Sequence, residues 1–162
     1  CYTVWINNTG NGSSADNPGN EFEDPIPGFT TYNNGSATAS SGTVAYNDSN
    51  KMITWNGAIP ANGSIEITFC VTVDANVSAG TTISNQGMVN YDSDGDGSND
   101  VQKPTDDPAT APLGDPTKLT TKVSLPIPAQ QIPVLTPVGV LALVGMLSIV
   151  LALSVNRRRK GE

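Results

Sequence analysis

Hydrophobic and polar residues alternate along several short stretches of the first hundred residues, which is the pattern of strands with one buried face. The longest stretch covers residues 64–74. Its apolar face is formed by Ile65, Ile67, Phe69, Val71 and Val73. Further strands are predicted over residues 1–6, 21–26, 29–32, 43–46, 52–55 and 81–91, most of them bounded by Gly, Pro, Asn or Ser. No helical period separates these stretches, so the outer part of the chain is predicted to be all-β.

Several short strands at this spacing predict an antiparallel β-sandwich, in which two sheets bury their apolar faces against each other. We place this domain at residues 1–103. Residues 104–133 are rich in Pro, Asp, Thr and Ala, a composition that favours an extended linker between the domain and the C-terminal part of the chain. Within it, residues 118–125 alternate again, and they form either a last strand or part of the extended linker.

The C-terminal part has a different pattern. Residues 135–155 carry no charge and are long enough, at about 1.5 Å per residue, to cross a hydrocarbon core of about 30 Å. We therefore predict one transmembrane helix over residues 134–156. The alternative, a buried core helix, is disfavoured by the length of the run and by the lack of an amphipathic partner. A basic cluster comes directly after it: Arg157, Arg158, Arg159 and Lys160.

That cluster predicts the orientation of the chain. By the positive-inside rule, residues 157–162 form a cytoplasmic tail and residues 1–131 lie outside the cell. Of the 15 acidic residues only Glu162 falls in the tail, so the outer part is strongly acidic. Because such a surface repels phosphates, no nucleic-acid partner is expected.

The chain of 162 residues contains no histidine, which removes the commonest general base and the commonest zinc ligand. Chemistry by carboxylates alone would have to use Glu21, Glu23 or Asp24, and nothing in the sequence positions a pair of them. We therefore expect the protein not to be an enzyme.

An acidic loop is the one candidate metal site. Four carboxylates fall at positions 1, 3, 5 and 9 of a calcium-loop pattern: Asp92, Asp94, Asp96 and Asp100. The backbone oxygen of Ser98, at position 7, would supply one more ligand. Oxygen ligands at this spacing suit Ca²⁺, which takes 6–8 of them. Lys103 stands at position 12 in place of a bidentate Glu, so Asp106 or Asp107 would have to complete the shell. The alternative is a solvated acidic hairpin tip, because Asp-Gly is also a favoured turn. Repulsion among the carboxylates favours structural calcium.

The membrane segment is preceded by a short motif formed by Ile132, Pro133, Val134, Leu135 and Gly139. Together with the apolar segment and the arginine cluster, this motif resembles the C-terminal sorting signals of bacterial exosortase systems. It is closest to the class that opens Ile-Pro-Thr-Leu, although Val134 replaces the Thr and Val138 replaces a Trp. The resemblance implies a sorting peptidase as partner, cleavage near the motif and transfer of the outer part to another surface anchor. If the chain is cleaved near the motif, the helix is a temporary anchor. If it is not cleaved, the helix is a permanent anchor.

The outer domain also has recognisable features. They are residues 2–10, Ala15 to Gly19, Glu23 to Pro27, Trp55-Asn56, Asn62-Gly63-Ser64 and Ser84 to Gly87. Over about residues 1–116 this pattern resembles the Ig-like conserved repeat of bacterial surface proteins. The resemblance implies an Ig-like fold, a cell-surface location and a role as a stalk or adhesive module. The family usually has a strand before the first one here, so we expect this chain to be a fragment that lacks it.

Cys1 and Cys70 lie on the strand faces opposite the predicted core. In the strand order of the Ig-like family their strands are neighbours in one sheet, so a disulfide across the outer face is expected. Two free thiols are the alternative, and secretion favours oxidation.

These features predict a non-catalytic structural or adhesive module of the cell surface, with upstream repeats of the same chain as neighbours. The alternative is a subunit of an extracellular filament that self-associates, with the missing strand supplied by a neighbouring copy.

Overall fold

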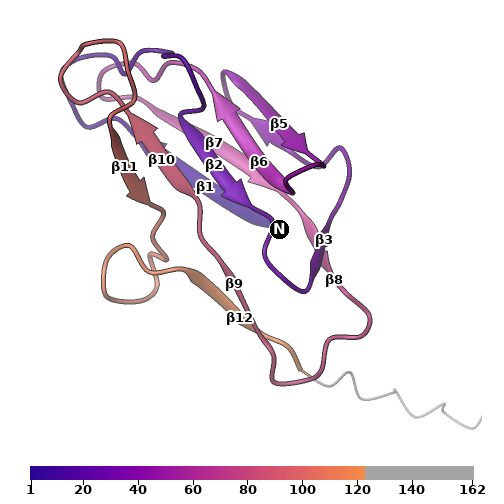
Figure 1. Ribbon diagram of the computed structural model, residues 1–162. Helices are drawn as coiled ribbons and strands as arrows, with labels where there is room; N and C mark the ends of the chain where they lie inside the picture. Colours follow the sequence, from indigo (N-terminus) through magenta and orange to yellow (C-terminus); the bar gives the residue numbers. More distant parts are fainter. Residues whose placement is uncertain (123–162) are drawn as a thin grey trace, which may run out of the picture. The chain divides into compact units, whose positions relative to one another are not determined.

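A computed structural model of the protein describes residues 1–122, and all their regular elements are β-strands (Figure 1). In chain order they are β1 (Tyr2–Asn7), β2 (Phe22–Pro25), β3 (Thr30–Tyr32), β4 (Thr38–Ala39), β5 (Thr43–Asn47), β6 (Met52–Asn56), β7 (Ser64–Phe69), β8 (Val71–Val73), β9 (Thr82–Asn85), β10 (Met88–Tyr91), β11 (Val101–Pro104) and β12 (Thr117–Thr120). The all-β prediction is confirmed for residues 1–122.

The strands form two main sheets and two ribbons. One sheet has the order β1-β7-β4, the other β11-β10-β2-β6-β5, and the ribbons pair β3 with β8 and β9 with β12. Every strand pair is antiparallel. Because β1 and β11 end their sheets, each offers one backbone edge that no other strand of the described part covers.

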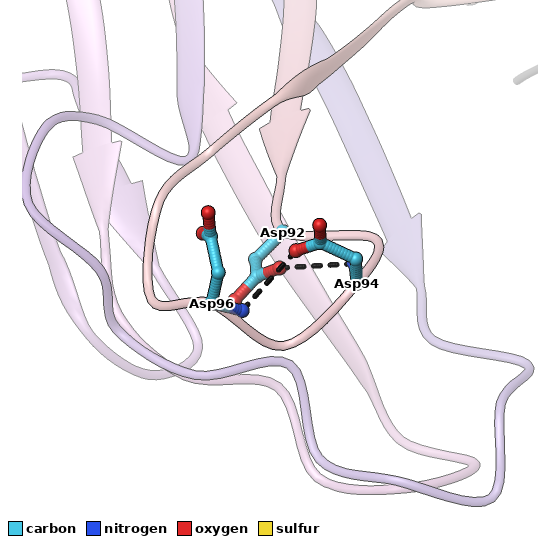
Figure 2. A group of neighbouring side chains, drawn as sticks. All are labelled: Asp92, Asp94 and Asp96. Carbon is cyan, nitrogen blue, oxygen red and sulfur yellow. Dashed lines mark hydrogen bonds between the residues drawn. The ribbon is translucent and has the colours of Figure 1, made fainter.

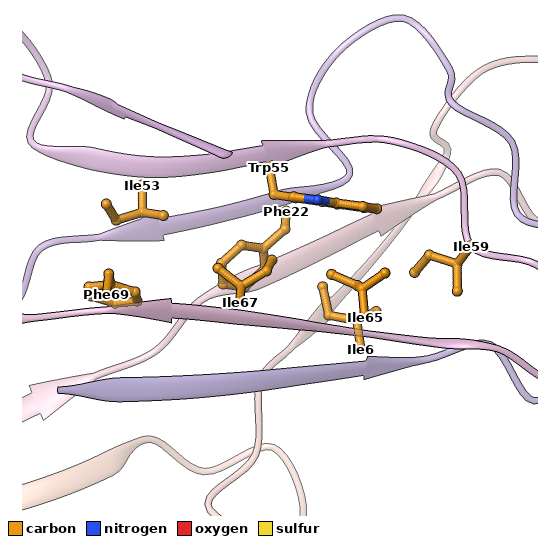
Figure 3. Packing of buried hydrophobic residues seen from close by; sticks show 8 residues of the cluster. All are labelled: Ile6, Phe22, Ile53, Trp55, Ile59, Ile65, Ile67 and Phe69. Atoms are coloured by element: carbon orange, nitrogen blue, oxygen red, sulfur yellow. The ribbon is translucent and has the colours of Figure 1, made fainter. Parts of the chain in front are cut away.

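The core lies between the inner faces of the two main sheets (Figure 3). Ile6 of β1 and the alternating Ile65, Ile67 and Phe69 of β7 supply one side. The other side comes from Phe22, Ile53 and Trp55, on β2 and β6. Burying these alternate residues stabilises the domain at roughly 25 cal/mol per Å² of apolar surface. The arrangement is sandwich-like, as the alternation predicts.

Two predicted strands are each divided in the structure. Residues 64–74 form β7 and β8, which meet at Cys70 and pair with different strands. The amide of Cys70 donates to Ser36 Oγ at 3.0 Å, and its carbonyl accepts from the amide of Asn33 at 2.9 Å. Residues 81–91 are divided at Gln86 and Gly87 into β9 and β10. Alternation alone predicts an extended chain and does not show where a strand changes partner.

The compact unit includes residues 104–122, beyond the boundary at residue 103 expected from composition. Gln86 explains part of the difference, because its Nε2 donates to the carbonyls of Thr105 at 2.9 Å and Gly114 at 2.6 Å. β12 then pairs with β9 within the alternating stretch at residues 118–125. Residues 104–122, rich in Pro and Asp, thus fold back onto the domain.

The remaining sequence predictions fall beyond this part of the chain. The helix at 134–156, the sorting motif, the basic tail and linker residues 123–133 lie outside the described residues. Within residues 1–122, no helix is long and apolar enough to cross a membrane.

Candidate functional site

The acidic loop connects β10 to β11 and brings three carboxylates together (Figure 2). Asp92, Asp94 and Asp96 each place one carboxylate oxygen so that all three oxygens lie within 4.8 Å of one another. The three residues occupy alternate positions of one tight turn, which brings these oxygens close together. This is the part of the predicted ligand set that the fold assembles.

Asp92 organises the turn through backbone hydrogen bonds. Its Oδ1 accepts from the amides of Asp94 at 3.1 Å and Gly95 at 2.7 Å, and its Oδ2 accepts from the amide of Gly97 at 2.8 Å. Gly95 and Gly97 have φ angles of 84° and 87°, which an L side chain rarely adopts. The bonds from Gly97 and Gly95 hold the pKa of Asp92 below its usual range, because they stabilise the ionised form.

The other residues of the predicted ligand set form hydrogen bonds of their own. The carboxylate of Asp100 accepts from the amide and the hydroxyl of Ser93, at 2.8 and 3.0 Å. Ser98 donates its amide to Asp96 Oδ1 at 2.8 Å. Asp106 and Asp107 accept from Gly114 and Ala109 in the loop before β12. Three hard oxygen ligands suit Ca²⁺ in kind, but they are fewer than the 6–8 that it takes.

A buried polar cluster around Glu21 anchors this loop to the domain. Glu21 Oε1 accepts from the amide of Asn17 at 2.9 Å and from Asn99 Nδ2 at 3.3 Å. Its Oε2 accepts from the amide of Gly57 at 3.1 Å and, with the Asn56 amide turned to face it, from Asn56 Nδ2. Donors from several parts of the chain therefore satisfy one buried carboxylate.

The sequence singled out Glu21 only as a candidate for carboxylate chemistry. The structure gives it, Glu23 and Asp24 separate environments: Glu23 accepts from Asn20 Nδ2 at 2.9 Å, while Asp24 is fully buried in the core beside Asn85. The cluster around Glu21 escaped the sequence analysis because its donors come from loops far apart along the chain.

A disulfide joins Cys1 and Cys70, with their Cα atoms 4.0 Å apart, as expected from the sequence. The register explains it, because Tyr2 pairs with Phe69 and so places the next residues outward along both strands opposite each other. The bond closes a loop with a sequence separation of 69 residues at one end of the β1-β7-β4 sheet.

A cavity of about 970 Å³ lies along β1. Every residue from 2 to 8 lines it, together with Val89 and Tyr91 of β10 and Lys103 of β11, among others. A cavity lined by consecutive strand residues follows the strand's backbone edge, because side chains alone would contribute every second residue. The free edge of β1 thus borders this cavity, which residues of both main sheets line.

No family model matches the chain, and no curated protein or solved structure is significantly similar to it.

Proposed function

We propose that the protein is a non-catalytic structural or adhesive module of the cell surface. The observation that carries this proposal is the Cys1–Cys70 disulfide in a small acidic β-domain. Disulfides persist in oxidising compartments and are rare in reducing ones. The bond also restrains the end of edge strand β1, which suits a domain that must stay folded outside the cell.

The proposal includes an anchor and a sorting step. Residues 134–156 hold the chain in the membrane as one helix, with residues 157–162 in the cytoplasm. A sorting peptidase recognises the motif around Ile132 and Pro133 and transfers the Ig-like outer part to another surface anchor. Support comes from the charge-free run that ends in the arginine cluster, and from the resemblance to sorting signals and to Ig-like surface repeats.

Mass spectrometry of the protein recovered from its host tests the sorting step. Cleavage predicts a C-terminus near Leu135 and loss of the arginine cluster. An intact Arg157–Lys160 segment on the mature surface protein would contradict cleavage and leave a permanent anchor.

A structural calcium ion in the acidic loop is a further part of the proposal. Asp92, Asp94 and Asp96 would hold it, with the remaining ligands supplied by water or backbone oxygens. What supports it is the convergence of three carboxylate oxygens within 4.8 Å in a turn already organised by backbone bonds. The ion would neutralise their repulsion and stiffen the loop.

A second candidate function is that of a filament subunit, in which a neighbouring copy adds a strand to β1. The observation that favours it is the cavity along the free edge of β1, because added strands bind by main-chain hydrogen bonds to such edges. Light scattering of the purified full chain in detergent tests this candidate. Concentration-dependent assembly supports it, and a fully folded protein that stays monomeric at all concentrations rules it out.

A further inference from the structure

Asp24 is a fully buried carboxylate that takes part in neither the acidic loop nor the Glu21 cluster. It lies on β2, two residues after Phe22, and both side chains point into the core with 0% exposure. Gly87 leaves room for it: a Cβ there would lie 2.6 Å from Cε2 of Phe22 and 3.2 Å from Cγ of Asp24. The fold therefore accommodates an acid among its core side chains.

The partner of Asp24 is Asn85, at the end of β9. Asn85 Nδ2 donates to Asp24 Oδ2 at 3.0 Å. The other two oxygens of the pair, Asp24 Oδ1 and Asn85 Oδ1, are buried and have no hydrogen-bond partner among the described residues. A buried oxygen without a hydrogen-bond partner has lost its hydration without compensation, which destabilises the fold. Both atoms are acceptors while Asp24 is ionised, so they cannot bond to each other, whereas a proton on Asp24 Oδ1 would make it a donor to Asn85 Oδ1.

The charges around Asp24 do not compensate an ionised carboxylate. Tyr2, from β1, is the titratable group that faces it, and the pKa of Tyr2 is raised by burial and then by Asp24. On β6 its register partner is Ile53, and from the segment joining β9 to β10 it meets Asn85 and Gly87. The salt bridge found within residues 1–122 joins Lys51 to Asp48 on the surface, and it does not involve Asp24. Burial therefore raises the pKa of Asp24 to about 6, although the Asn85 bond lowers it somewhat.

We propose that Asp24 and Asn85 form a proton-operated latch between the sandwich and the β9–β12 ribbon. In the protonated state the Asp24 hydroxyl donates to Asn85 Oδ1 while Asn85 Nδ2 donates to Asp24 Oδ2. One proton thus satisfies both unpartnered oxygens, and an acid–amide pair with two hydrogen bonds holds β9 to β2. Loss of the proton breaks the second bond and leaves a negative charge in the core.

The latch acts on the ribbon because, among the strands of residues 1–122, β9 pairs with β12 alone. Apart from the buried Ile83, Asn85 is the inward-facing residue of β9. The ribbon leads directly to residues 121–122, where the described part of the chain ends. The attachment of the ribbon to the sandwich is strongest while Asp24 is protonated. It weakens as the pH rises through the pKa of Asp24 in the folded protein and stays weak at higher pH.

Two measurements on the full chain in detergent micelles test the latch. By NMR, the Asp24 carboxyl carbon is expected to titrate with a midpoint near pH 6, and the Asn85 side-chain amide to shift with the same midpoint. Amide hydrogen exchange, corrected for the intrinsic effect of pH, should show protection of β9 and β12 falling between about pH 4 and pH 7.5. The fall is at most about 100-fold, since two pKa units correspond to that factor.

Asp24→Asn keeps the shape without the titration, so ribbon protection should no longer change with pH. Asp48→Asn, at an exposed acid, is the matched control and should keep the wild-type change. An Asp24 midpoint at or below pH 4, an Asn85 amide that does not titrate, or wild-type protection that is constant with pH would each overturn the proposal. The wild-type titration needs no variant, so it decides the question even where Asp24→Asn fails to fold.

Discussion

Asn99 in the acidic loop donates its side-chain amide to the buried carboxylate of Glu21, a residue 78 positions earlier. Asn99 Oδ1 in turn accepts from Asn17 Nδ2 at 3.1 Å. Asn99 is therefore bonded both to the loop that contains Asn17 and to Glu21, which directly precedes β2. The acidic loop is thereby attached to the core of the domain at its C-terminal side. Whatever the loop binds would act on a segment fixed in place.

Glu21→Gln tests how much the polar cluster around Glu21 contributes to the stability of the domain. The amide would direct an N–H group toward donors that now face a carboxylate, leaving buried groups unpaired. We expect the free energy of unfolding to fall by about 2–4 kcal/mol, because hydrogen bonds to a buried charge are among the strong ones. Denaturant unfolding followed by the fluorescence of Trp55 measures it. Glu66→Gln, on the outer face of β7, is the control and should change stability by less than about 0.5 kcal/mol.

Asp94→Ala tests the calcium proposal. The parent protein should melt at a higher temperature in calcium than in a chelator, and the variant should lose this difference because one of three converging oxygens is gone. Asp48→Ala removes an exposed acid of the β5–β6 turn and should preserve the difference. Equal melting of the parent in calcium and in chelator would show that the loop binds no calcium.

Replacing both cysteines by serine tests the contribution of the disulfide. The bond spans 69 residues, so its loss should lower the free energy of unfolding by about 2–5 kcal/mol, chiefly through greater freedom of the unfolded chain. Reduction of the wild type should produce a similar loss. Unchanged stability in both experiments would mean that β1 is held by the sheet alone.

Gly42→Ala tests the packing around Trp55. Gly42 has a φ of 72°, and a Cβ there would lie 2.6 Å from Trp55 Nε1, whose N–H donates to the Ser41 carbonyl at 2.7 Å. Gly35 has a similar φ of 78° with open space around it, so Gly35→Ala isolates the backbone strain. We expect the free energy of unfolding to fall by about 1 kcal/mol in Gly35→Ala and by clearly more in Gly42→Ala. Equal effects on the free energy of unfolding would show that the indole moves aside easily.

Alternation predicted the core face of β7 correctly, because Ile65, Ile67 and Phe69 each obey the two-residue period that burial imposes. It could not predict the change of partner at Cys70, since the apolar pattern continues unbroken to Val73. That change depends on bonds from Ser36 and Asn33, which lie far away in the sequence.

The buried acids were missed for a different reason. Asp24 has the same parity as Phe22, so its strand position points it inward. Charged residues are almost never fully buried without a partner, and that partner, Asn85, is known only once the strands are assembled. Residues 104–122 were likewise assigned to a linker from their composition. The two hydrogen bonds from Gln86 that hold this segment on the domain have no sequence signature, so the sequence could not predict them.

The central claim is that the β-domain lies outside the cell and that the C-terminal tail of the chain lies in the cytoplasm. Labelling of intact host cells tests it most directly. An amine reagent that does not cross membranes should modify the exposed Lys51, Lys103 and Lys118 on intact cells, while Lys160 of chains that still carry the tail should react only after the membrane is permeabilised. Quantitative mass spectrometry of the labelled peptides gives the result. Labelling of the domain lysines only after the cells are opened would contradict the account.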